Sequence, residues 1–357
     1  MKRPLAVELL GPSAGGIRRH VAYLRDQLRD AGWDVETAGP PGVLDDLDHA
    51  VPIPGGVRPG QVLASRRALR PLLQSADVLH AHGLKAGWVA ATVAPRPPLV
   101  VSIHNLVLDE VAGRTAFALR RLEGQLPARA DVTIAVSAEV ARRFAGLPGH
   151  ERIRVIPPAG PPPVPKRSRA AVRAELGIDE GDDLVVTAAR LHPQKGLELL
   201  LDAAALARQR RPRLRWFVFG EGPLRPALEQ DIARRGLGDT VCLAGPRPDV
   251  DSELAAADVV AVTSQWESGP LVVLEALALG RPVVATDVGL VSEVIDAASG
   301  RVVDVGDVDG FAAALVRALD DASSDPGTDL ARSGGRFRPS ALAAEIEAVY
   351  REVLEAR

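Results

Sequence analysis

Residues 264–280 read SQWESGPLVVLEALALG, and this stretch carries the most informative pattern in the chain. The run just before it is mostly apolar and β-branched, which predicts a buried strand that ends where the stretch begins. Gly269 and Pro270 suit the N-cap and first position of a helix through the apolar residues that follow. Glu267 is therefore expected on a loop at the carboxyl end of a strand. Glu275 is the one charge in a helix that should be largely buried, and a buried carboxylate needs a partner.

Short apolar strands alternate with helical patterns along the rest of the chain. This alternation predicts an α/β fold in which each half forms a parallel, doubly wound sheet flanked by helices. Strands are expected at residues 5–10, 77–80, 99–103, 132–136 and 153–156, and again at 184–188, 214–219, 241–243, 258–262 and 282–285. Helices are expected at 17–31, 115–129, 308–319 and 340–356.

The proline-rich stretch PPAGPPPVP, residues 157–165, separates the two halves. Such a run continues neither a helix nor a sheet, and it predicts a semi-rigid linker. The expected domains are therefore residues 1–160 and residues 161–339. A chain of 357 residues with 46% hydrophobic side chains can fill two cores of this size.

Composition narrows the class of protein. The single cysteine, Cys242, excludes an intramolecular disulfide framework and suits a reducing compartment. No apolar run approaches the roughly 20 residues of a membrane-spanning helix, so we expect a cytoplasmic protein, at most peripheral at the inner membrane face. Residues 1–160 carry 20 Lys and Arg against 15 Asp and Glu, although the whole chain has a net charge of −3. The first half is the better candidate for an anionic partner.

Four further patterns lie beside predicted strands. They are ARLHPQKG at residues 189–196, GEGPL at 220–224, GRPVVAT at 280–286 and GPSAGGI at 11–17. The glycine spacing of the last is not the G-x-G-x-x-G of dinucleotide-binding proteins, which argues against a simple dehydrogenase.

Together with residues 264–280, and in the same order along the chain, these patterns resemble the motifs of the retaining, GT-B-fold glycosyltransferases of family four. Glu267 and Glu275 match the E-x(7)-E element of that family. The resemblance implies two Rossmann-like domains that face a central cleft, with the C-terminal segment 340–357 completing the first domain. It also implies a role in glycan biosynthesis, by transfer of a sugar from a nucleotide-sugar donor to an acceptor hydroxyl, with retention of configuration and without a metal or other cofactor.

The resembled family grips the donor diphosphate with the loop that matches residues 189–196, which points to Arg190 and Lys195 as catalytic residues. Cations at a strand-to-helix junction would stabilise the charge on a leaving diphosphate, whereas the alternative is that both are ordinary surface charges. The resemblance places Glu275 on the donor ribose and Glu267, a catalytic candidate, near the donor sugar. Otherwise Glu275 would pair with a basic core neighbour and Glu267 would face solvent.

The remaining expected donor contacts come from loops whose backbone can approach a ligand closely. They are Gly15, Gly16, Gly222, Ser268, Gly269 and Leu271. Members of the family usually follow the first glutamate with Gly-Phe-Gly or Gly-Phe-Pro, whereas this chain has Ser268-Gly269-Pro270. Pro270 has no N–H to offer, so the identity of the donor sugar stays open.

His104 follows the predicted strand 99–103 and matches a family histidine near the donor sugar, which makes it a catalytic candidate; a lone histidine at a strand end is otherwise structural. His80 and His82 are expected to alternate in and out of the sheet, so that at most one reaches the site. His82, nearer the strand tip, is the acceptor-side candidate together with Arg19. No cysteine or acidic residue lies at ligand spacing, and no metal site is expected.

Basic and apolar residues share the helix expected at 115–129. The arginines are Arg114, Arg120, Arg121 and Arg129, interleaved with Phe117, Leu119 and Leu122. Such a patch suits an anionic membrane surface that carries a lipid-linked acceptor, or else it is a solvated face. The expected acceptor is a glycan, a lipid-linked sugar or a small molecule, and no nucleic acid partner is expected.

Two other functions are compatible with such a two-domain cleft. A nucleotide-sugar epimerase would interconvert sugars without any acceptor. A non-catalytic sugar-nucleotide-binding protein would bind the donor without hydrolysing or transferring it. The complete set of Arg190, Lys195, Glu267 and Glu275 argues against the non-catalytic alternative.

Overall fold

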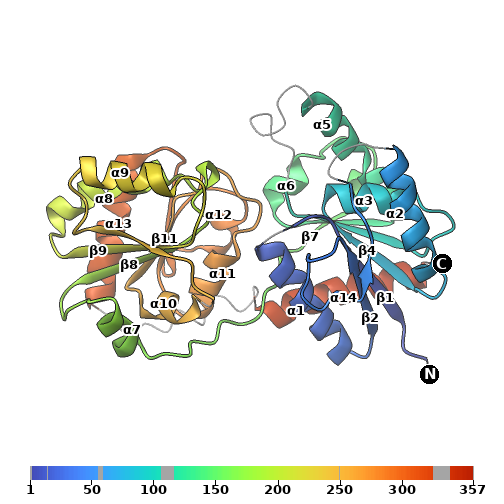
Figure 1. Cartoon of the computed structure of the whole chain (residues 1–357), viewed down its shortest axis with the longest axis horizontal. Coiled ribbons are helices and arrows are strands. Elements are labelled where there is room, and N and C mark those ends of the chain that lie inside the picture. The colour runs from blue at the N-terminus through green and yellow to red at the C-terminus, as the bar shows by residue number, and fades with distance from the viewer. Residues whose placement is uncertain are drawn as a thin grey trace. The chain divides into compact units, whose positions relative to one another are not determined.

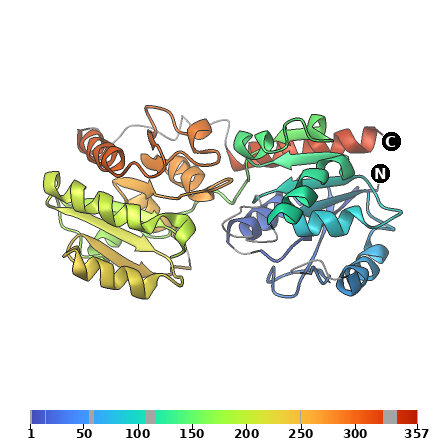
Figure 2. The ribbon, with the colours of Figure 1, turned by 90° about the horizontal axis from the view of Figure 1, so that it is seen from above.

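The computed structural model describes residues 2–13, 15–54, 59–105, 116–248, 250–324 and 338–356. The chain forms two compact units, Met1–Pro161 together with Arg338–Arg357, and Pro162–Phe337. Each unit is a Rossmann-like parallel sheet with helices on both faces (Figures 1 and 2). This is the α/β class that the alternation of strands and helices predicted.

In the described part of the first unit, seven parallel strands pair in the order β3-β2-β1-β4-β5-β6-β7. They are β1 Leu5–Leu10, β2 Asp34–Gly39, β3 His49–Ala50, β4 Val78–His82, β5 Leu99–Ile103, β6 Val132–Ala135 and β7 Ile153–Val155. The sequence predicted all but β2 and β3, with ends correct to within two residues. β2 reads DVETAG, which has no apolar run, and β3 has only two residues, so neither gave a clear signal.

Helices cover both faces of the first sheet. On one face α1 Gly16–Asp30 lies beside the C-terminal helix α14 Pro339–Glu355 (Figure 1). Trp33 and Tyr350 pack edge to face in the apolar cluster there, with ring centroids 5.4 Å apart. On the other face α2 Pro59–Leu72 and α3 Leu84–Ala91 cover a second apolar cluster. The remaining elements of this unit are α5 Ala116–Gln125, η2 Pro127–Arg129, α6 Ala138–Arg142 and η3 His150–Arg152.

In the described part of the second unit, six parallel strands pair in the order β10-β9-β8-β11-β12-β13. They are β8 Asp183–Ala188, β9 Leu214–Phe219, β10 Val241–Gly245, β11 Val259–Val262, β12 Val283–Thr286 and β13 Gly300–Val303. The short edge strand β13 was not predicted. The strand order reverses between β8 and β11, and ligands of such sheets bind beside that point, at the carboxyl ends of the strands.

The helices of the second unit also lie on both faces of its sheet. On one face α8 Leu197–Arg210 and α13 Val308–Ser324 pack on a cluster in which the rings of Trp216 and Phe311 stack. The opposite face holds α7 Arg169–Glu175, α10 Asp251–Ala256 and α11 Leu271–Ala278. The other elements are η4 Pro193–Lys195, α9 Arg225–Arg234 and α12 Val291–Val294. Among the residues described, no helix combines the length and apolar character needed to cross a membrane.

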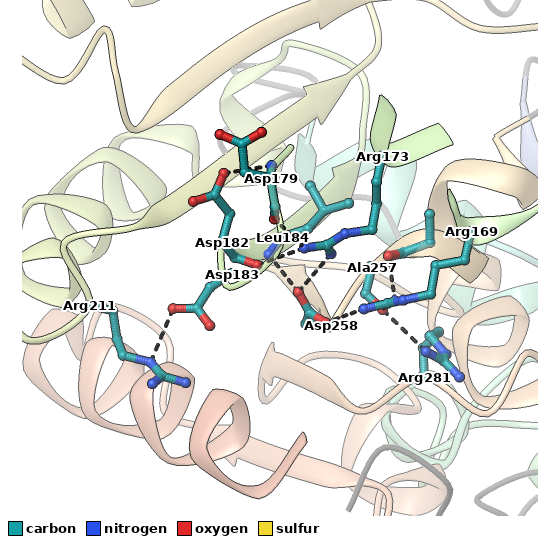
Figure 3. Close-up of polar contacts among 11 residues, drawn as sticks. Arg169, Arg173, Asp179, Asp182, Asp183, Leu184, Arg211, Ala257, Asp258 and Arg281 are labelled. Carbon is teal, nitrogen blue, oxygen red and sulfur yellow. Dashed lines mark hydrogen bonds and ion pairs between the residues drawn. The ribbon is translucent and has the colours of Figure 1, made fainter. Parts of the chain in front are cut away.

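Ion pairs and hydrogen bonds connect α7 to the amino ends of β8 and β11, the two central strands of the second sheet, as Figure 3 shows. Asp258, just before β11, accepts hydrogen bonds from Arg169 and Arg173, which lie one turn apart on α7. It also accepts from the backbone N–H of Leu184 at 2.7 Å. Arg173 donates in addition to the carbonyl oxygen of Asp182 at 2.7 Å. A structural network therefore occupies the amino ends of these strands. The loops of the candidate site follow their carboxyl ends, on the opposite side of the sheet.

The proline-rich stretch 157–165 divides between the two units. Ala159 is fully buried within the first unit. The backbone N–H of Val164 donates to Asp251 of α10 at 2.8 Å, within the second unit. Each end of the stretch is thus tied to its own unit.

Candidate functional site

Loops from two neighbouring strands meet in the second unit. β8 leads into Arg190 and then into η4, which ends at Lys195, whereas β11 leads into Glu267. β8 and β11 pair directly in the sheet. The fold therefore brings the cations predicted to hold a diphosphate close to the carboxylate predicted to lie near the sugar.

Lys195 and Glu267 form an ion pair, in which Nζ of the lysine contacts Oε1 of the glutamate. Their side chains are only 20% and 11% exposed. Glu267 also accepts hydrogen bonds from Ser264 Oγ at 3.0 Å and from Gln194 Nε2 at 3.4 Å. Gln194 Oε1 lies 3.5 Å from the guanidinium Nη2 of Arg190. Gln194, which had no signal in the sequence, thus links Arg190 to the carboxylate that pairs with Lys195.

Main-chain contacts fix the two loops against each other. The backbone N–H of Gln265 donates to the carbonyl oxygen of Gln194 at 2.8 Å. The hydroxyl of Thr263 donates to the carbonyl oxygen of Lys195 at 2.9 Å. Gly196 has a φ of 58°, and a Cβ there would overlap the Thr263 carbonyl oxygen, so only glycine permits this approach. The backbone of Lys195 is therefore held in place while its ammonium remains able to exchange partners.

The glycine turn at residues 220–222 follows β9 and packs on the Arg190 loop. The backbone N–H of Leu191 donates to the carbonyl oxygen of Glu221 at 3.0 Å. A Cβ on Gly222 would overlap the carbonyl oxygen of Leu191. The glycine thus allows two main chains to lie in contact next to Arg190, and its contact with a donor stays a prediction.

The helix that carries Glu275 begins one residue later than predicted. Pro270 is extended, with φ −72° and ψ 101°, so it occupies the N-cap, and Leu271 is the first helical residue. The prediction that Gly269 is the N-cap and Pro270 the first helical residue was wrong by this one position. Glu275 is buried, at 6% exposed, as its place in an apolar helix indicated.

The loop between β11 and α11 rests on the end of β12. Thr286 donates from its hydroxyl to the carbonyl oxygen of Ser264 at 2.5 Å. Gly289 has a φ of 61°, and a Cβ on it would lie 2.7 Å from the carbonyl oxygens of Glu267 and Ser268. Of the predicted donor-binding residues, Ser268 is therefore backed by a close main-chain contact, and the roles of Ser268, Gly269 and Leu271 in binding stay predictions.

A second group of polar side chains lies inside the first unit, on the face covered by α1 and α14. Glu8 of β1 accepts hydrogen bonds from His82 Nε2 at 2.7 Å and from the Tyr350 hydroxyl at 2.6 Å. His80 Nδ1 lies 2.5 Å from the Tyr350 hydroxyl oxygen, and His80 Nε2 lies 2.7 Å from Ser102 Oγ. All five residues are at most 2% exposed. They form a hydrogen-bonded network sealed within the unit.

His80 and His82 lie on the same face of β4, contrary to the prediction. Side chains alternate along a strand, so residues two positions apart point the same way. Both histidines contact Glu8, whose backbone pairs with His80 in the sheet. The prediction that they alternate in and out of the sheet was wrong because it treated residues two apart as if they were adjacent, and the place of His82 on the acceptor side stays a prediction.

His104 lies at the end of this network in a cluster of histidines. His104 Nε2 is 3.1 Å from Nδ1 of His82. The ring of His20, on α1, packs against both, with centroids 5.2 Å from that of His104 and 5.7 Å from that of His82. His20 Nδ1 lies 2.8 Å from the carbonyl oxygen of Ala159. His104 is thus at a strand end as predicted, but it is not a lone histidine.

Burial controls the protonation of the network. Burial, together with repulsion from His82, lowers the pKa of His20 from its ordinary 6.5 to about 4. Burial and the neighbouring His80 lower the pKa of His82 to about 4 as well, and burial holds the pKa of His104 well below its usual range. Burial alone would raise the pKa of Glu8, but the charge of His80 and hydrogen bonds from His80 and His82 outweigh it and hold that pKa below its usual range. At neutral pH these three histidines are therefore neutral beside an ionised carboxylate.

The glycine loop after β1 leads into α1. Gly15 is the N-cap with a φ of 63°, and Gly16 is the first helical residue. A Cβ on Gly15 would meet no atom within 4 Å, so its positive φ, rather than lack of space, favours glycine. Both glycines and Arg19 are exposed. Their predicted contacts with donor and acceptor stay predictions.

The basic helix predicted at 115–129 is shorter than expected. α5 ends at Gln125, and the short η2 follows because Pro127 cannot continue the helical hydrogen bonding. Phe117 is 79% exposed on α5. The guanidinium of Arg129 lies over the Trp88 ring, 5.6 Å from its centroid. Arg114 and the predicted helix start lie outside the described residues.

Two sets of side chains in the described part of the chain have the geometry to hold a metal ion. One is His20, His82 and His104, and the other is Glu8, His80 and His82. No such site was expected from the sequence, because no ligands lie at metal-binding spacing along a single segment. These side chains come instead from β1, α1, β4 and the end of β5. By contrast, the group around Lys195 offers cationic donors and suits an anion.

Several of these residues were missed by the sequence analysis, although some had a signal. Glu8 is a charge in the middle of an otherwise apolar strand, which indicates a buried partner. The two-residue spacing of His80 and His82 indicates a shared face. His20 and Tyr350 had no such signal, since each lies on a helix far in sequence from β4, whose histidines it meets.

Residues 168–331 match the family model of glycosyl transferases group 1, and residues 14–159 match that of glycosyltransferase family 4. The chain is 32% identical to a D-inositol 3-phosphate glycosyltransferase of Thermobispora bispora, over 96% of this chain and 91% of that protein. It is 31% identical to an alpha-D-kanosaminyltransferase of Streptomyces kanamyceticus, over 52% of this chain and 49% of that protein.

Solved structures share the fold at low sequence identity. A sucrose-phosphate synthase from Thermosynechococcus elongatus matches with a TM-score of 0.82 at 24% identity, over 100% of both chains. The Anabaena protein HepE, in complex with UDP and glucose, matches with a TM-score of 0.81 at 23% identity, over 97% of this chain and 99% of that one.

Proposed function

Because this chain belongs to the group 1 glycosyltransferases of family four, which have the GT-B fold and use nucleotide-sugar donors, we propose that it transfers the donor sugar with retention of anomeric configuration and without a metal ion. The observation that carries the proposal is the ion pair between Lys195 and Glu267. It brings a cation suited to phosphate and a carboxylate suited to sugar hydroxyls to the adjacent ends of β8 and β11.

The diphosphate of the donor would bind to Arg190 and Lys195. When the bond between sugar and diphosphate breaks, negative charge develops on the departing oxygen, and fixed cations beside it lower the energy of the transition state. Lys195 supplies a compact charge just before α8, and the N-terminus of a helix favours an anion as well.

Donor binding would also change the partner of Lys195. In the structure its ammonium contacts Glu267, and a diphosphate with more negative charge competes for the same cation. When Lys195 turns to the phosphate, Glu267 keeps the hydrogen bonds from Ser264 and Gln194. The freed carboxylate oxygen then accepts hydrogen bonds from the sugar hydroxyls or stabilises the positive charge that develops on the sugar ring. Binding of the diphosphate therefore prepares Glu267 for the sugar.

Two further residues complete the proposed donor contacts. The carboxylate of Glu275 has two oxygens with which to accept hydrogen bonds from the ribose hydroxyls. His104, neutral at neutral pH, offers its Nδ1 to a sugar hydroxyl, since its Nε2 lies 3.1 Å from Nδ1 of His82. In the proposed retaining reaction the departing phosphate oxygen takes the proton of the acceptor hydroxyl on the same face of the sugar.

The first acceptor class to test is a small phosphorylated polyol. A relative that matches nearly the whole chain is named for transfer to D-inositol 3-phosphate. Residues 1–160, the half of the chain proposed to meet the acceptor, carry 20 Lys and Arg against 15 Asp and Glu. An excess of basic residues favours an anionic acceptor.

The testing experiment starts with thermal unfolding in EDTA buffer with UDP, GDP, ADP, TDP and CDP. A ligand at 100 times its dissociation constant adds about 2.7 kcal/mol to the free energy of unfolding. The sugar nucleotide of the base that binds is then incubated with inositol phosphates, and NMR of the product gives its anomeric configuration. Absence of stabilisation by every nucleoside diphosphate would overturn the proposal.

The same assay separates the two alternatives. An epimerase would convert the donor sugar when no acceptor is present. A non-catalytic binding protein would be stabilised by a nucleotide but would leave the donor unchanged with any acceptor. A product of inverted configuration would refute retention. A rate of transfer that is lost in EDTA and restored by added metal would refute metal independence.

We also propose weak peripheral binding to anionic membranes through α5. Phe117 is 79% exposed and Arg121, four residues on, is exposed as well, so an apolar group and a cation share one helix face. Vesicles that contain phosphatidylserine should sediment the wild-type protein, and Phe117→Ser should weaken this binding. Equal recovery with phosphatidylcholine vesicles would contradict the proposal.

A further inference from the structure

The three imidazoles of His20, His82 and His104 are arranged as in a metal site. Their ring centroids are 5.7, 5.2 and 5.4 Å apart, and one nitrogen of each lies within 4.8 Å of one nitrogen of each other ring. Three imidazoles bound to one tetrahedral zinc ion, with Zn–N distances of about 2.0–2.1 Å, place their centroids roughly 5 Å apart. The observed rings would need only small shifts to reach that geometry.

Hydrogen bonds already fix the tautomers that metal binding requires. The carbonyl oxygen of Ala159 can only accept, so His20 donates to it from Nδ1 and its Nε2 carries a lone pair. Glu8 is ionised and likewise accepts, so His82 donates to it from Nε2 and its Nδ1 carries a lone pair. Metal-bound histidines characteristically donate their second ring nitrogen to a carboxylate or a backbone carbonyl. Two of the three rings have that outer partner in place.

His104 supplies the third ligand. Its Nε2 lies 3.1 Å from His82 Nδ1, where it donates to the lone pair of His82 in the absence of a metal. A metal ion would replace this hydrogen bond, and the proton of His104 would move to Nδ1. Three neutral imidazoles suit zinc, copper or nickel, and they leave the fourth coordination position open.

We propose that His20, His82 and His104 form a binding site for a divalent transition metal ion such as zinc, and that occupation of this site inhibits sugar transfer. The first part depends only on the cluster. The second part rests on the proposed function, in which His104 contacts the donor sugar and His82 lies on the acceptor side. A bound metal would hold both rings in place and move the proton of His104 to Nδ1, so that this nitrogen could no longer accept a hydrogen bond from a substrate hydroxyl. In the proposed function transfer needs no metal, so an ion that holds these two rings would act as an inhibitor.

Calorimetry with zinc chloride tests the binding site directly. The full-length protein is first freed of metal with EDTA and gel filtration. We expect one zinc ion per chain for the wild type. His20→Asn keeps a side-chain N–H for the Ala159 carbonyl but removes the Nε2 ligand, so the affinity should fall at least about 10-fold. The matched control is His150→Asn, because His150 is 55% exposed in the same unit and should not contribute.

Two results would overturn the metal site. One is a wild-type protein that binds no zinc, and the other is a His20→Asn variant that is folded by circular dichroism yet binds zinc as tightly as the wild type. Cobalt chloride gives a second readout on the unmodified chain. A tetrahedral cobalt site absorbs visible light far more strongly than aqueous six-coordinate cobalt, and a spectrum of the six-coordinate ion in the protein would also refute the assignment.

The transfer assay tests the inhibition. Zinc should lower the rate of the wild type and of His150→Asn, EDTA should restore it, and the zinc concentration for half inhibition should rise at least about 10-fold in His20→Asn. Zinc binding without loss of rate would refute the inhibition and leave the site intact. A chain that binds zinc but transfers no sugar from any donor would refute the proposed function, and with it the inhibition, while calorimetry alone decides the metal site.

Discussion

His82 Nε2 lies 2.7 Å from Glu8 Oε2, and both side chains are completely enclosed in the first unit. The contact joins two neighbouring strands, β1 and β4, on the face that α1 and α14 cover. A buried carboxylate is costly unless it is hydrogen-bonded, and here the Tyr350 hydroxyl and His82 both donate to it. The fold therefore places an ionised Glu8 next to a neutral His82, and this arrangement is sensitive to acid.

We predict that the protein loses stability as the pH falls from 6.5 to 4, in EDTA buffer. His20 and His82 each have a folded pKa of about 4 against an ordinary 6.5, so in this window the unfolded chain binds protons that the folded chain does not. Stability then rises with pH, by up to about 1.4 kcal/mol per pH unit for each histidine, and is lost as the pH falls. The lowered pKa of Glu8 acts in the same direction at lower pH. Urea unfolding at several pH values measures the slope.

A matched pair of variants tests the origin of this slope. His20→Asn removes one of the titrating groups, so the free energy of unfolding should depend less steeply on pH between 6.5 and 4. His150→Asn changes an exposed histidine and should leave the slope as it is in the wild type. Equal slopes in all three proteins would show that the buried cluster is not the source of acid sensitivity.

The sequence predicted the fold well because the signals are local. Apolar runs gave the central strands of both sheets, and β1, β5 and β9 were predicted with both ends correct. The edge strands β3 and β13 were missed, and so was β2, which lies next to β3. They are short or partly polar, and their pairing depends on neighbours that are distant in sequence.

The part of the candidate site that was predicted also had local signals. Arg190, Lys195 and Glu267 belong to motifs that can be read along the chain, and the structure brings them together. Their link Gln194 has no pattern of its own. The network around Glu8 joins residues up to 342 positions apart, so its hydrogen bonds with Tyr350 could not be inferred from spacing. The orientation of His80 and His82 could have been predicted, since alternation along a strand is a local rule.

Lys195→Ala should weaken the binding of the preferred nucleoside diphosphate by about 10- to 100-fold. Loss of one charge-assisted hydrogen bond costs roughly 1.5–3 kcal/mol. Calorimetry on the wild type and the variant measures the change, and circular dichroism checks that the variant is folded. Lys166→Ala is the control, since Lys166 is an exposed lysine of the same unit, remote from the β8 and β11 loops in sequence. Unchanged affinity in Lys195→Ala would remove Lys195 from the proposed diphosphate site.

Glu267→Gln should slow sugar transfer without weakening nucleotide binding, in contrast to Lys195→Ala. The glutamine keeps the size of the side chain and one acceptor oxygen for the Ser264 hydroxyl, whereas its NH2 group replaces the oxygen that accepts from Gln194, and it no longer holds the Lys195 ammonium by charge. Lys195 then meets a diphosphate without competition, so nucleotide affinity should be equal to or higher than that of the wild type. The rate of transfer should fall by at least about 100-fold, because the carboxylate that supports the sugar is lost. Initial rates at saturating donor, compared with calorimetry on the nucleotide alone, separate the two effects; loss of nucleotide affinity would contradict the proposed division of roles.

Asp258→Ala should destabilise the second unit by about 3 kcal/mol, because it leaves Arg169 and Arg173 without their carboxylate and Leu184 without its acceptor (Figure 3). The Asp258 side chain is only 21% exposed, so water replaces these bonds poorly. Urea unfolding measures the difference. Asp321→Ala is the matched control, since its ion pair with Arg301 is 64% exposed on the aspartate side and should contribute less than about 1 kcal/mol. Similar losses in both variants would mean that the network is no more important than a surface ion pair.

Gly222→Ala should slow sugar transfer more than it weakens the fold. The new methyl group would overlap the Leu191 carbonyl oxygen, so the Arg190 loop must move away from the turn at 220–222. A displacement of about 1 Å in a group that positions the substrate can cost roughly 100-fold in rate. Gly238→Ala provides the comparison, because a Cβ there meets no atom within 4 Å and the backbone needs no positive φ. We therefore expect the transfer rates of the two variants to differ far more than their unfolding midpoints. If Gly222→Ala transferred sugar as fast as Gly238→Ala, the Arg190 loop would not have to rest on this turn.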